Sequence, residues 1–180
     1  YTAAHAILQL LQDNKKVAVT ANSHKAILNV LHAVHQAMQE ADVDFPLVKV
    51  RGNDDDPLIQ SGVIQYVPES NQAVNALGGG PLVMGGTAWV FCRPELQGEF
   101  DYLFVDEAGQ FSLANVVATG LSADNIVLVG DQMQLAQPML GAHPGDSGKS
   151  ALEYLLGGHA TIPPHFGIFL NQTWRMHPNI

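Results

Sequence analysis

A run of three apolar residues followed at once by two acids is the feature that most constrains the fold of this chain. Leu103, Phe104 and Val105 suit a strand that is buried on both faces, as the strands of parallel sheets are. The strand ends at Asp106 and Glu107, and small residues follow that let the chain turn away. Ligands of open α/β sheets bind outside the carboxyl ends of the strands, so the sequence predicts that both carboxylates lie at a ligand-binding crevice.

Short apolar runs alternate with helical patterns along the rest of the chain. Apolar residues at helical spacing predict helices over residues 2–13, 23–41, 112–119 and 151–156. Strands are expected over residues 17–20, 47–50, 82–84, 102–105, 126–129 and 167–170, with an extra edge strand over 63–67. This alternation predicts an α/β protein in which helices cover both faces of a mainly parallel sheet, which is a three-layer fold.

The composition limits the functional classes. A chain of 180 residues with 47% hydrophobic content is long enough for one domain with a substantial core. No apolar run approaches the ~20 residues of a membrane span, and no secretory segment opens the sequence. From these two features we expect a cytoplasmic protein without membrane partners, and the single Cys92, which excludes an intrachain disulfide, fits a reducing compartment. The net charge of −9, with only eight Lys and Arg residues, argues against strong nucleic-acid binding by this chain alone.

Two further polar motifs follow predicted strands. Gly130, Asp131 and Gln134 come after the run 126–129, and the long amide of Gln134 can contact a phosphate oxygen and an attacking water together. Arg175 comes after the run 167–170 and suits an arginine finger, whose guanidinium stabilises the charge of a phosphoryl-transfer transition state. A polar turn and a structural ion pair are the alternative interpretations of these two motifs. Asp106 and Glu107 could likewise simply cap the helix that follows them.

The three motifs together resemble a known family. The segments FVDEAGQ (104–110), VGDQMQL (129–135) and WRMHP (174–178) look like motifs II, III and IV of superfamily 1 helicases, in the order of that family. The branch they resemble contains the nonsense-mediated-decay RNA helicase and related 5′→3′ DNA helicases. Some bacterial members of this branch are fused to a RecB-type nuclease. The resemblance extends over residues 1–180 and implies the first RecA-like lobe of a two-lobed motor with a P-loop NTPase fold.

The resemblance also implies a set of roles. ATP and Mg²⁺ are the implied cofactors, with Asp106 as the Walker B ligand of Mg²⁺ and Glu107 as the general base. Gln134 and Arg175 would complete the catalytic group. The other implied nucleotide-binding residues are Gln110, Gly130 and Asp131. The implied activity is ATP hydrolysis coupled to movement on single-stranded DNA or RNA, with a second RecA-like lobe as partner.

Two strand-end loops resemble motifs that contact the nucleic-acid strand. The segment 17–26 resembles motif Ia, in which Thr20, Ser23 and Lys25 suit phosphate contacts. Residues 85–89 resemble motif Ic, and this implies a strand contact at Thr87. Trp89 could stack a base, although Val90 and Phe91 beside it favour a place in the core.

The phosphate-binding loop G-x-x-x-x-G-K-[ST] of this family has no match in the sequence. Gly148, Lys149 and Ser150 imitate its end, but His143 stands where its first glycine belongs, and the loop before it is rich in proline. We interpret this segment as a polar turn in which Ser150 caps the helix 151–156, and hold a phosphotransferase that uses Lys149 to be the weaker hypothesis. We therefore expect residues 1–180 to be a partial, inactive motor lobe. A non-catalytic RecA-like module for protein or nucleic-acid binding is the alternative.

Two other polar groups are interpreted as surface features. His32 and His35 have the one-turn spacing of metal ligands, but no third ligand joins them, so surface histidines are preferred to a zinc site. The acids 54–56 are interpreted as a solvated loop before Pro57, because calcium loops spread their acids over alternating positions.

Overall fold

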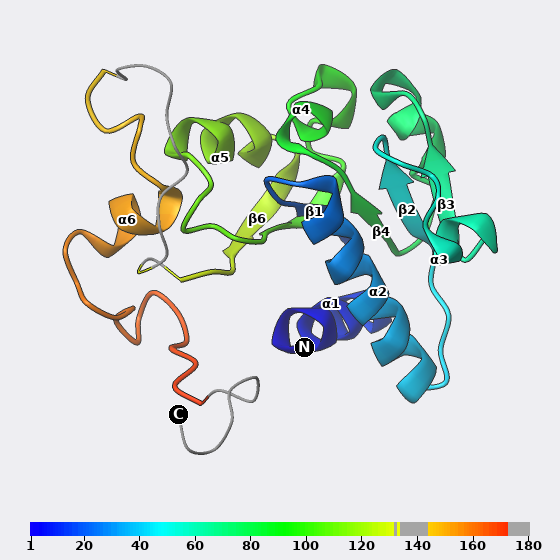
Figure 1. Ribbon diagram of the computed structural model, residues 1–180, viewed down its shortest axis with the longest axis horizontal. Coiled ribbons are helices and arrows are strands. Elements are labelled where there is room, and N and C mark those ends of the chain that lie inside the picture. The colour runs from blue at the N-terminus through cyan, green and yellow to red at the C-terminus, as the bar shows by residue number, and fades with distance from the viewer. Residues whose placement is uncertain (132, 134–143, 173–180) are drawn as a thin grey trace.

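The fold is that of a computed structural model, which describes residues 1–131, 133 and 144–172. Its helices are α1 (Thr2–Gln12), α2 (His24–Glu40), α3 (Pro57–Gln60), α4 (Ala88–Phe91), α5 (Leu113–Gly120) and α6 (Ala151–Leu156), with two 3₁₀ turns, η1 (Ser70–Ala76) and η2 (Pro94–Leu96). Its strands are β1 (Lys16–Thr20), β2 (Leu47–Val50), β3 (Ile64–Val67), β4 (Leu82–Gly85), β5 (Phe100–Val105) and β6 (Ala123–Leu128). Figure 1 shows these elements along the chain.

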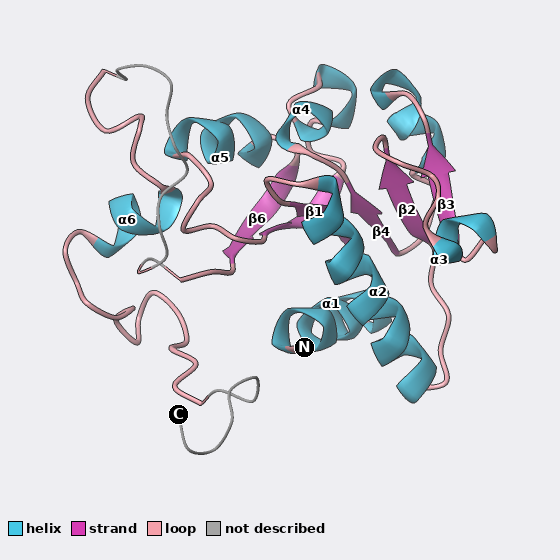
Figure 2. Ribbon diagram, in the orientation of Figure 1, coloured by secondary structure: helices cyan, strands magenta, loops and turns pink. Residues whose placement is uncertain are grey.

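The described strands form one sheet in the order β3-β2-β4-β1-β5-β6, and every pair in it is parallel. Helices lie on both sides of this sheet, as Figure 2 shows. The predicted α/β class with three layers is therefore confirmed, and the arrangement is consistent with a RecA-like fold. The carboxyl ends of all strands share one edge, because the strands run in one direction.

Each face of the sheet carries its own core. The helices α1 and α2 cover one face, where Ile7, Leu11 and Ile27 pack on Val19 and Phe104. On the other face α4, α5 and α6 join the two 3₁₀ turns over Leu103 and Val105. Successive residues of a strand point to opposite faces, so β5 supplies Phe104 to the first core and its two neighbours to the second. The central strands are thus buried on both sides, as the apolar run 103–105 predicts.

Most of the predicted elements are confirmed, within a few residues at their ends. The helices expected over 2–13, 23–41, 112–119 and 151–156 correspond to α1, α2, α5 and α6. The expected extra edge strand is β3, which lies at one end of the sheet. The strand expected over 126–129 begins earlier, as β6. No helix in the described ranges is long and apolar enough to span a membrane.

Two predictions are wrong. Residues 167–170 form no strand: Ile168 is 85% exposed, and Phe169 and Leu170 are also exposed. An apolar run becomes a strand only when a sheet edge pairs with it, and no described strand does so here. Trp89, for which the core was favoured, is 79% exposed on α4, whereas its neighbours Val90 and Phe91 are buried.

Candidate functional site

The two acids of the first motif lie where β5 leaves the sheet. The Asp106 N–H donates to the Thr20 carbonyl at 2.8 Å, so Asp106 sits beside the end of β1. On the other side, the Ala108 N–H donates to the Val129 carbonyl at 2.9 Å, which links the turn after β5 to the turn after β6. The carboxyl ends of three neighbouring strands therefore meet around Asp106.

Glu107 has a left-handed backbone with φ of +55°. This conformation costs a residue with a Cβ about 1–2 kcal/mol, and such strain persists only where the surrounding structure imposes it. The Gln110 N–H donates to the Glu107 carbonyl at 2.8 Å and closes the turn. The strain ends the strand abruptly and is typical of functional sites, where it helps to fix the direction of a side chain.

Gly130 brings the first two motifs into direct contact. A Cβ at this position would lie 2.8 Å from the backbone nitrogen of Ala108 and 3.1 Å from that of Gly109. Only a residue without a side chain fits against backbone at this distance. Asp131 follows, exposed, and its carboxylate accepts a hydrogen bond from the Met133 N–H at 2.9 Å. The turns after β5 and β6 therefore lie side by side, and Asp106, Glu107 and Gly130 share this edge of the sheet. Gln134 and Arg175 lie outside the described residues.

The side chain of Asp106 is half-buried. Burial raises the pKa of this carboxyl, and a backbone hydrogen bond from Glu107 acts in the opposite direction. The first turn of α1 lies at the same edge of the sheet as the acids. This follows from the topology, because a helix that precedes a parallel strand runs back along it and begins near its carboxyl end. The exposed N–H groups of a helix start are a suitable place for phosphate.

The end of β1 and the start of α2 contain the three residues of the motif Ia resemblance. Thr20 is completely buried, and its hydroxyl has no hydrogen-bond partner within the described residues. Ser23 caps α2 by accepting from the Ala26 N–H at 3.1 Å, and its own O–H remains able to donate. Lys25, in the first turn of α2, is exposed. Ser23 and Lys25 are therefore accessible to a strand, and Thr20 is not.

The end of β4 contains the residues of the motif Ic resemblance. The Gly86 N–H donates to the Val19 carbonyl at 3.0 Å, so this loop leaves the sheet beside β1. Thr87 is partly exposed and precedes α4 without a side-chain capping bond. The exposed Trp89 lies two residues further on, in the first turn of α4. A polar residue and a large exposed aromatic ring thus occupy the same strand end.

The segment that imitates a phosphate-binding loop has a structural role. Ser150 accepts from the Glu153 N–H at 3.1 Å and caps α6, as predicted. The Lys149 ammonium pairs with Asp146 at 2.8 Å, which raises its pKa. Neither residue follows a strand of the sheet, so the geometry of a phosphate-binding loop is not formed here.

The histidine pair and the acidic loop form no metal site. His32 Nε2 lies 2.9 Å from Asp56 Oδ1, and the same carboxylate caps α3 through the Leu58 N–H. Over the described ranges no group of three or more His, Cys, Asp or Glu side chains is placed to ligate a metal. His32 is therefore engaged with an acid that the sequence places 24 residues away.

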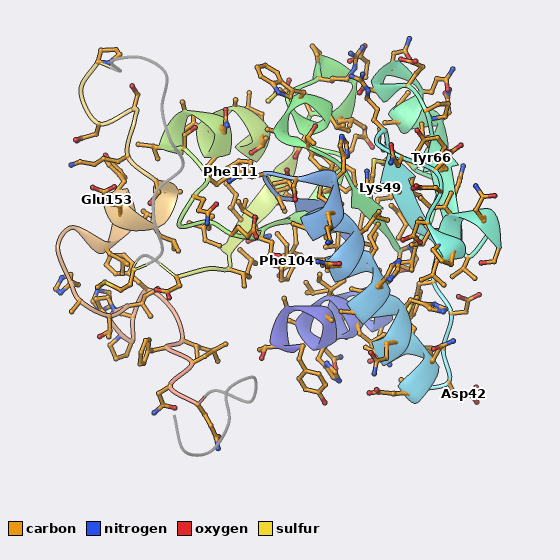
Figure 3. The ribbon with its side chains drawn as sticks, in the orientation of Figure 1. Asp42, Lys49, Tyr66, Phe104, Phe111 and Glu153 are labelled. Atoms are coloured by element: carbon orange, nitrogen blue, oxygen red, sulfur yellow. The ribbon has the colours of Figure 1, made fainter. Side chains whose placement is uncertain are left out.

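Sequence reasoning missed a buried cation. Lys49 on β2 is 0% exposed, and its Nζ lies 2.9 Å from Nδ1 of His24, the first residue of α2. Figure 3 shows Lys49 on β2 beside Tyr66 on β3. A strand that is buried on both faces must bury every side chain it carries. The lysine between Val48 and Val50 could therefore have been recognised from the sequence as a buried cation.

No protein-family model matches the sequence, and no curated protein matches it.

Proposed function

We propose that the chain is the ATPase lobe of a nucleic-acid helicase or translocase, which couples hydrolysis of Mg-ATP to movement on single-stranded DNA or RNA. The observation that carries the proposal is the packing of two strand-end turns. The backbone of Gly130 lies against that of Ala108 and Gly109, directly after the strained Glu107. Two motifs that are 24 residues apart, from Asp106 to Gly130, thus share one edge of a parallel sheet.

The residues at this edge fit a magnesium nucleotide. Mg²⁺ in nucleotide sites is bound by one or two carboxylates together with phosphates and water, so Asp106 alone can supply the protein ligand. When bound, the ion neutralises charge on the phosphates. Glu107 directly follows Asp106 and is the base that orients and deprotonates the attacking water. The start of α1 lies at the same edge and can receive phosphate oxygens at its free N–H groups.

The remaining nucleotide contacts come from the turns on either side. Gln110 closes the turn after Glu107, and Gly130 and Asp131 follow β6, so these three residues would surround the bound phosphates. Gln134 is assigned to sensing the terminal phosphate and Arg175 to stabilising the transition state. Both of these assignments rest on the motif resemblance, because the two residues lie outside the described part of the chain.

The strand-binding face is assigned to the ends of β1 and β4. Ser23, Lys25 and Thr87 offer a hydroxyl, an ammonium and a hydroxyl for phosphate contacts. The exposed ring of Trp89 beside them is suited to stack a base, an interaction that every base can make. Hydrolysis would alternate grip and release at this face as a second lobe closes and opens over the nucleotide.

The test is Glu107→Gln in a protein that also provides the phosphate-binding loop and the second lobe. ATP binding should persist, while strand-stimulated hydrolysis should fall by roughly 10²–10⁴-fold, because the base is lost and its shape is kept. Glu99→Gln, an exposed site at the amino end of β5, is the matched control and should leave hydrolysis unchanged. Turnover that survives Glu107→Gln would reject the assignment.

A non-catalytic RecA-like module is the second candidate. It is favoured by one observation: Lys149, in the segment that imitates a phosphate-binding loop, pairs with Asp146. This candidate predicts strand or protein binding that ATP does not alter, with no hydrolysis in the intact protein. Strand-stimulated ATPase measured on the intact protein and on residues 1–180 separates the two.

A further inference from the structure

The cations of this acidic chain are unevenly distributed. Seven of the eight Lys and Arg residues lie in the described ranges. Lys15, Arg93 and Lys149 each pair with a carboxylate, and Lys16 lies close enough to Asp101 to lower its pKa. The remaining three, Lys25, Lys49 and Arg51, have no carboxylate partner among the described side chains, and all three are placed where β2 ends and α2 begins.

Lys49 is the buried member of this group. Its Nζ contacts three acceptors: Nδ1 of His24 at 2.9 Å, the carbonyl of Val50 at 3.1 Å and the carbonyl of Arg51. An ammonium has three N–H donors, so the charged form is fully hydrogen-bonded without any acid. The ring nitrogen and the two carbonyls are neutral acceptors, so they do not cancel the charge of the ammonium. The electrostatic potential that Lys49 adds to this corner is therefore positive.

The turn after β2 is held in place from several sides. Arg51 and Gly52 both have left-handed backbones, with φ of +60° and +91°. The Arg51 N–H donates to the Val67 carbonyl at 2.8 Å, and the Tyr66 hydroxyl donates to the Gly52 carbonyl at 2.7 Å. A Cβ on Gly52 would lie 2.8 Å from the ring of His24, so the turn packs directly against α2. Lys49, through Arg51 and His24, joins the turn to the helix.

This arrangement leaves Arg51 exposed, and its guanidinium has no carboxylate partner in the described part of the chain. Its charge nevertheless acts on its surroundings. Burial lowers the pKa of His24, and the charges of Lys49 and Arg51 lower it further. The guanidinium therefore lies near the start of α2, where Lys25 is the next residue. Two accessible cations and one buried cation share this corner of the sheet edge.

We propose that Arg51 and Lys25 bind phosphate groups of a single-stranded nucleic acid, and that Lys49 is a positioning residue that fixes the turn of Arg51 against α2. This inference rests on the proposed function, and it extends the strand-binding face from the ends of β1 and β4 to the end of β2. Arg51 binds a phosphate through its planar donor fork. Lys49 touches no ligand and acts by holding the turn and by its charge.

The experiment measures binding of a fluorescein-labelled oligo(dT) strand and of inorganic polyphosphate to residues 1–180 at low salt. Arg51→Gln should weaken both by about tenfold and should reduce the slope of log affinity against log salt by about 1. Arg51→Lys should keep the salt slope but recover only part of the affinity, because an ammonium has the charge without the planar fork. Lys15→Gln, the same change of charge at the opposite edge of the sheet, is the control and should bind as the wild type does.

Neutralising acids near Arg51 tests the same location, and here the expected change is tighter strand binding. Asp54 and Asp55 are exposed and follow Arg51 in the same loop. A strand that passes over Arg51 is repelled by these carboxylates, so Asp54→Asn with Asp55→Asn should tighten oligo(dT) binding by a few fold. Glu153→Gln, an exposed acid on α6, should have no effect on binding.

The pH profile of binding by Lys49→Met distinguishes a positioning role of the Lys49 ammonium from a purely structural role of its side chain. The groups that face Lys49 are His24 on α2, Tyr66 on β3 and Arg51 on the turn. Because the pKa of Lys49 is lowered to about 8, the ammonium loses its proton in mildly alkaline solution, and wild-type affinity should decline as the pH rises through that value. Lys49→Met should bind weakly at every pH and lack this decline. A purely structural role would weaken binding without changing its pH profile.

The outcomes divide cleanly. If oligo(dT) binds Arg51→Gln as tightly as wild type, with the same salt slope, the inference is overturned while strand binding elsewhere on the lobe stands. If polyphosphate depends on Arg51 but oligo(dT) does not bind, the anion site is supported and the nucleic-acid function is rejected. If wild type binds neither probe, the anion site is rejected, and the hydrolysis measured with Glu107→Gln decides the proposed function separately.

Discussion

The carboxyl edge of the sheet has two halves of opposite character. Where β5 and β6 end, Asp106 and Glu107 sit on a strained turn that packs backbone to backbone against Gly130. Where β2 ends and α2 begins, Lys49, Arg51 and Lys25 lie together without a carboxylate partner among the described side chains. Both halves contain a residue in a left-handed conformation and a glycine pressed against a neighbouring element. The same architectural device thus underlies the two sites that we propose, one for a magnesium nucleotide and one for phosphate anions.

The comparison also resolves the difficulty of the net charge. A chain with a net charge of −9 repels a polyanion such as nucleic acid when its charge is averaged over the whole molecule. At close range the local field matters more, because charges separated by more than ~10 Å are largely screened at 0.1 M salt. Most other described cations pair with acids, whereas the accessible Lys25 and Arg51 have no carboxylate partner among the described side chains and remain available to an anion.

The largest expected effect concerns the acidic half. Glu107→Gly removes the carboxylate and relieves the left-handed strain, so hydrolysis by the intact protein should fall by roughly 10²–10⁴-fold while the free energy of unfolding stays level or rises by up to about 1 kcal/mol. Urea denaturation and ATPase assays measure the two quantities. Asp42→Gly, at a left-handed residue in an exposed turn, is the control and should affect stability alone. A stability loss above about 1 kcal/mol in Glu107→Gly would show that Glu107 is structural.

The second effect concerns the basic half. Burial lowers the pKa of Lys49 from 10.5 to about 8. Between these values the unfolded chain keeps the proton that the folded chain has lost, so the free energy of unfolding should increase with pH across this interval. The gain over the interval is at most about 3.4 kcal/mol. Urea denaturation from pH 7 to 10.5 should show the increase in wild type relative to Lys49→Met. Parallel pH profiles for the two proteins would mean that Lys49 titrates as in the unfolded chain.

A third test compares a glycine that packs against backbone with one that packs against side chains of α2. Gly130→Ala places a Cβ against rigid backbone in the acidic half and should destabilise by about 3 kcal/mol. Gly85→Ala places a Cβ 2.6 Å from Ile27 and 3.0 Å from Leu31 on α2, whose side chains can shift, so about 1 kcal/mol is expected. Gly79→Ala meets open space and is the control. The order Gly130, Gly85, Gly79 in chemical denaturation is the expected result, and its reversal would contradict the packing described.

The smallest expected effect concerns Trp89, which lies between the two halves. Because its ring is exposed, Trp89→Ala should change the free energy of unfolding by less than about 0.5 kcal/mol. Stacking on a base would make the same substitution weaken oligo(dT) binding by about 1 kcal/mol, and Trp89→Phe should recover part of that loss. Quenching of tryptophan fluorescence by the strand is an independent measurement. Unchanged affinity in Trp89→Ala would remove the ring from the binding face.

Prediction from sequence succeeded where the signal is local and failed where it is not. The run 103–105 and the acids after it predict a strand end, because burial on both faces and a change to polar residues are visible in consecutive positions. The requirement for glycine at position 130 becomes visible only in the structure, where its backbone packs against that of Ala108. Lys49 fits the pattern of a short strand, yet its partner His24 lies 25 residues away, and no spacing rule relates the two.

The two wrong predictions both came from apolar residues. Residues 167–170 and Trp89 have the composition of a buried strand and a core residue, and both are exposed. Hydrophobicity states what a side chain favours, but burial requires a partner surface, and the partner is chosen by the packing of distant segments.

Periodicity was enough to predict most of the strands and helices, the parallel class of the sheet and the strand ends that bear Asp106 and Glu107, because parallel strands share one edge. Three-dimensional packing determines which strand ends are neighbours, which of the described cations have no acid beside them and which apolar residues stay at the surface. These outcomes depend on contacts between residues far apart in the chain, whose energies no local pattern contains.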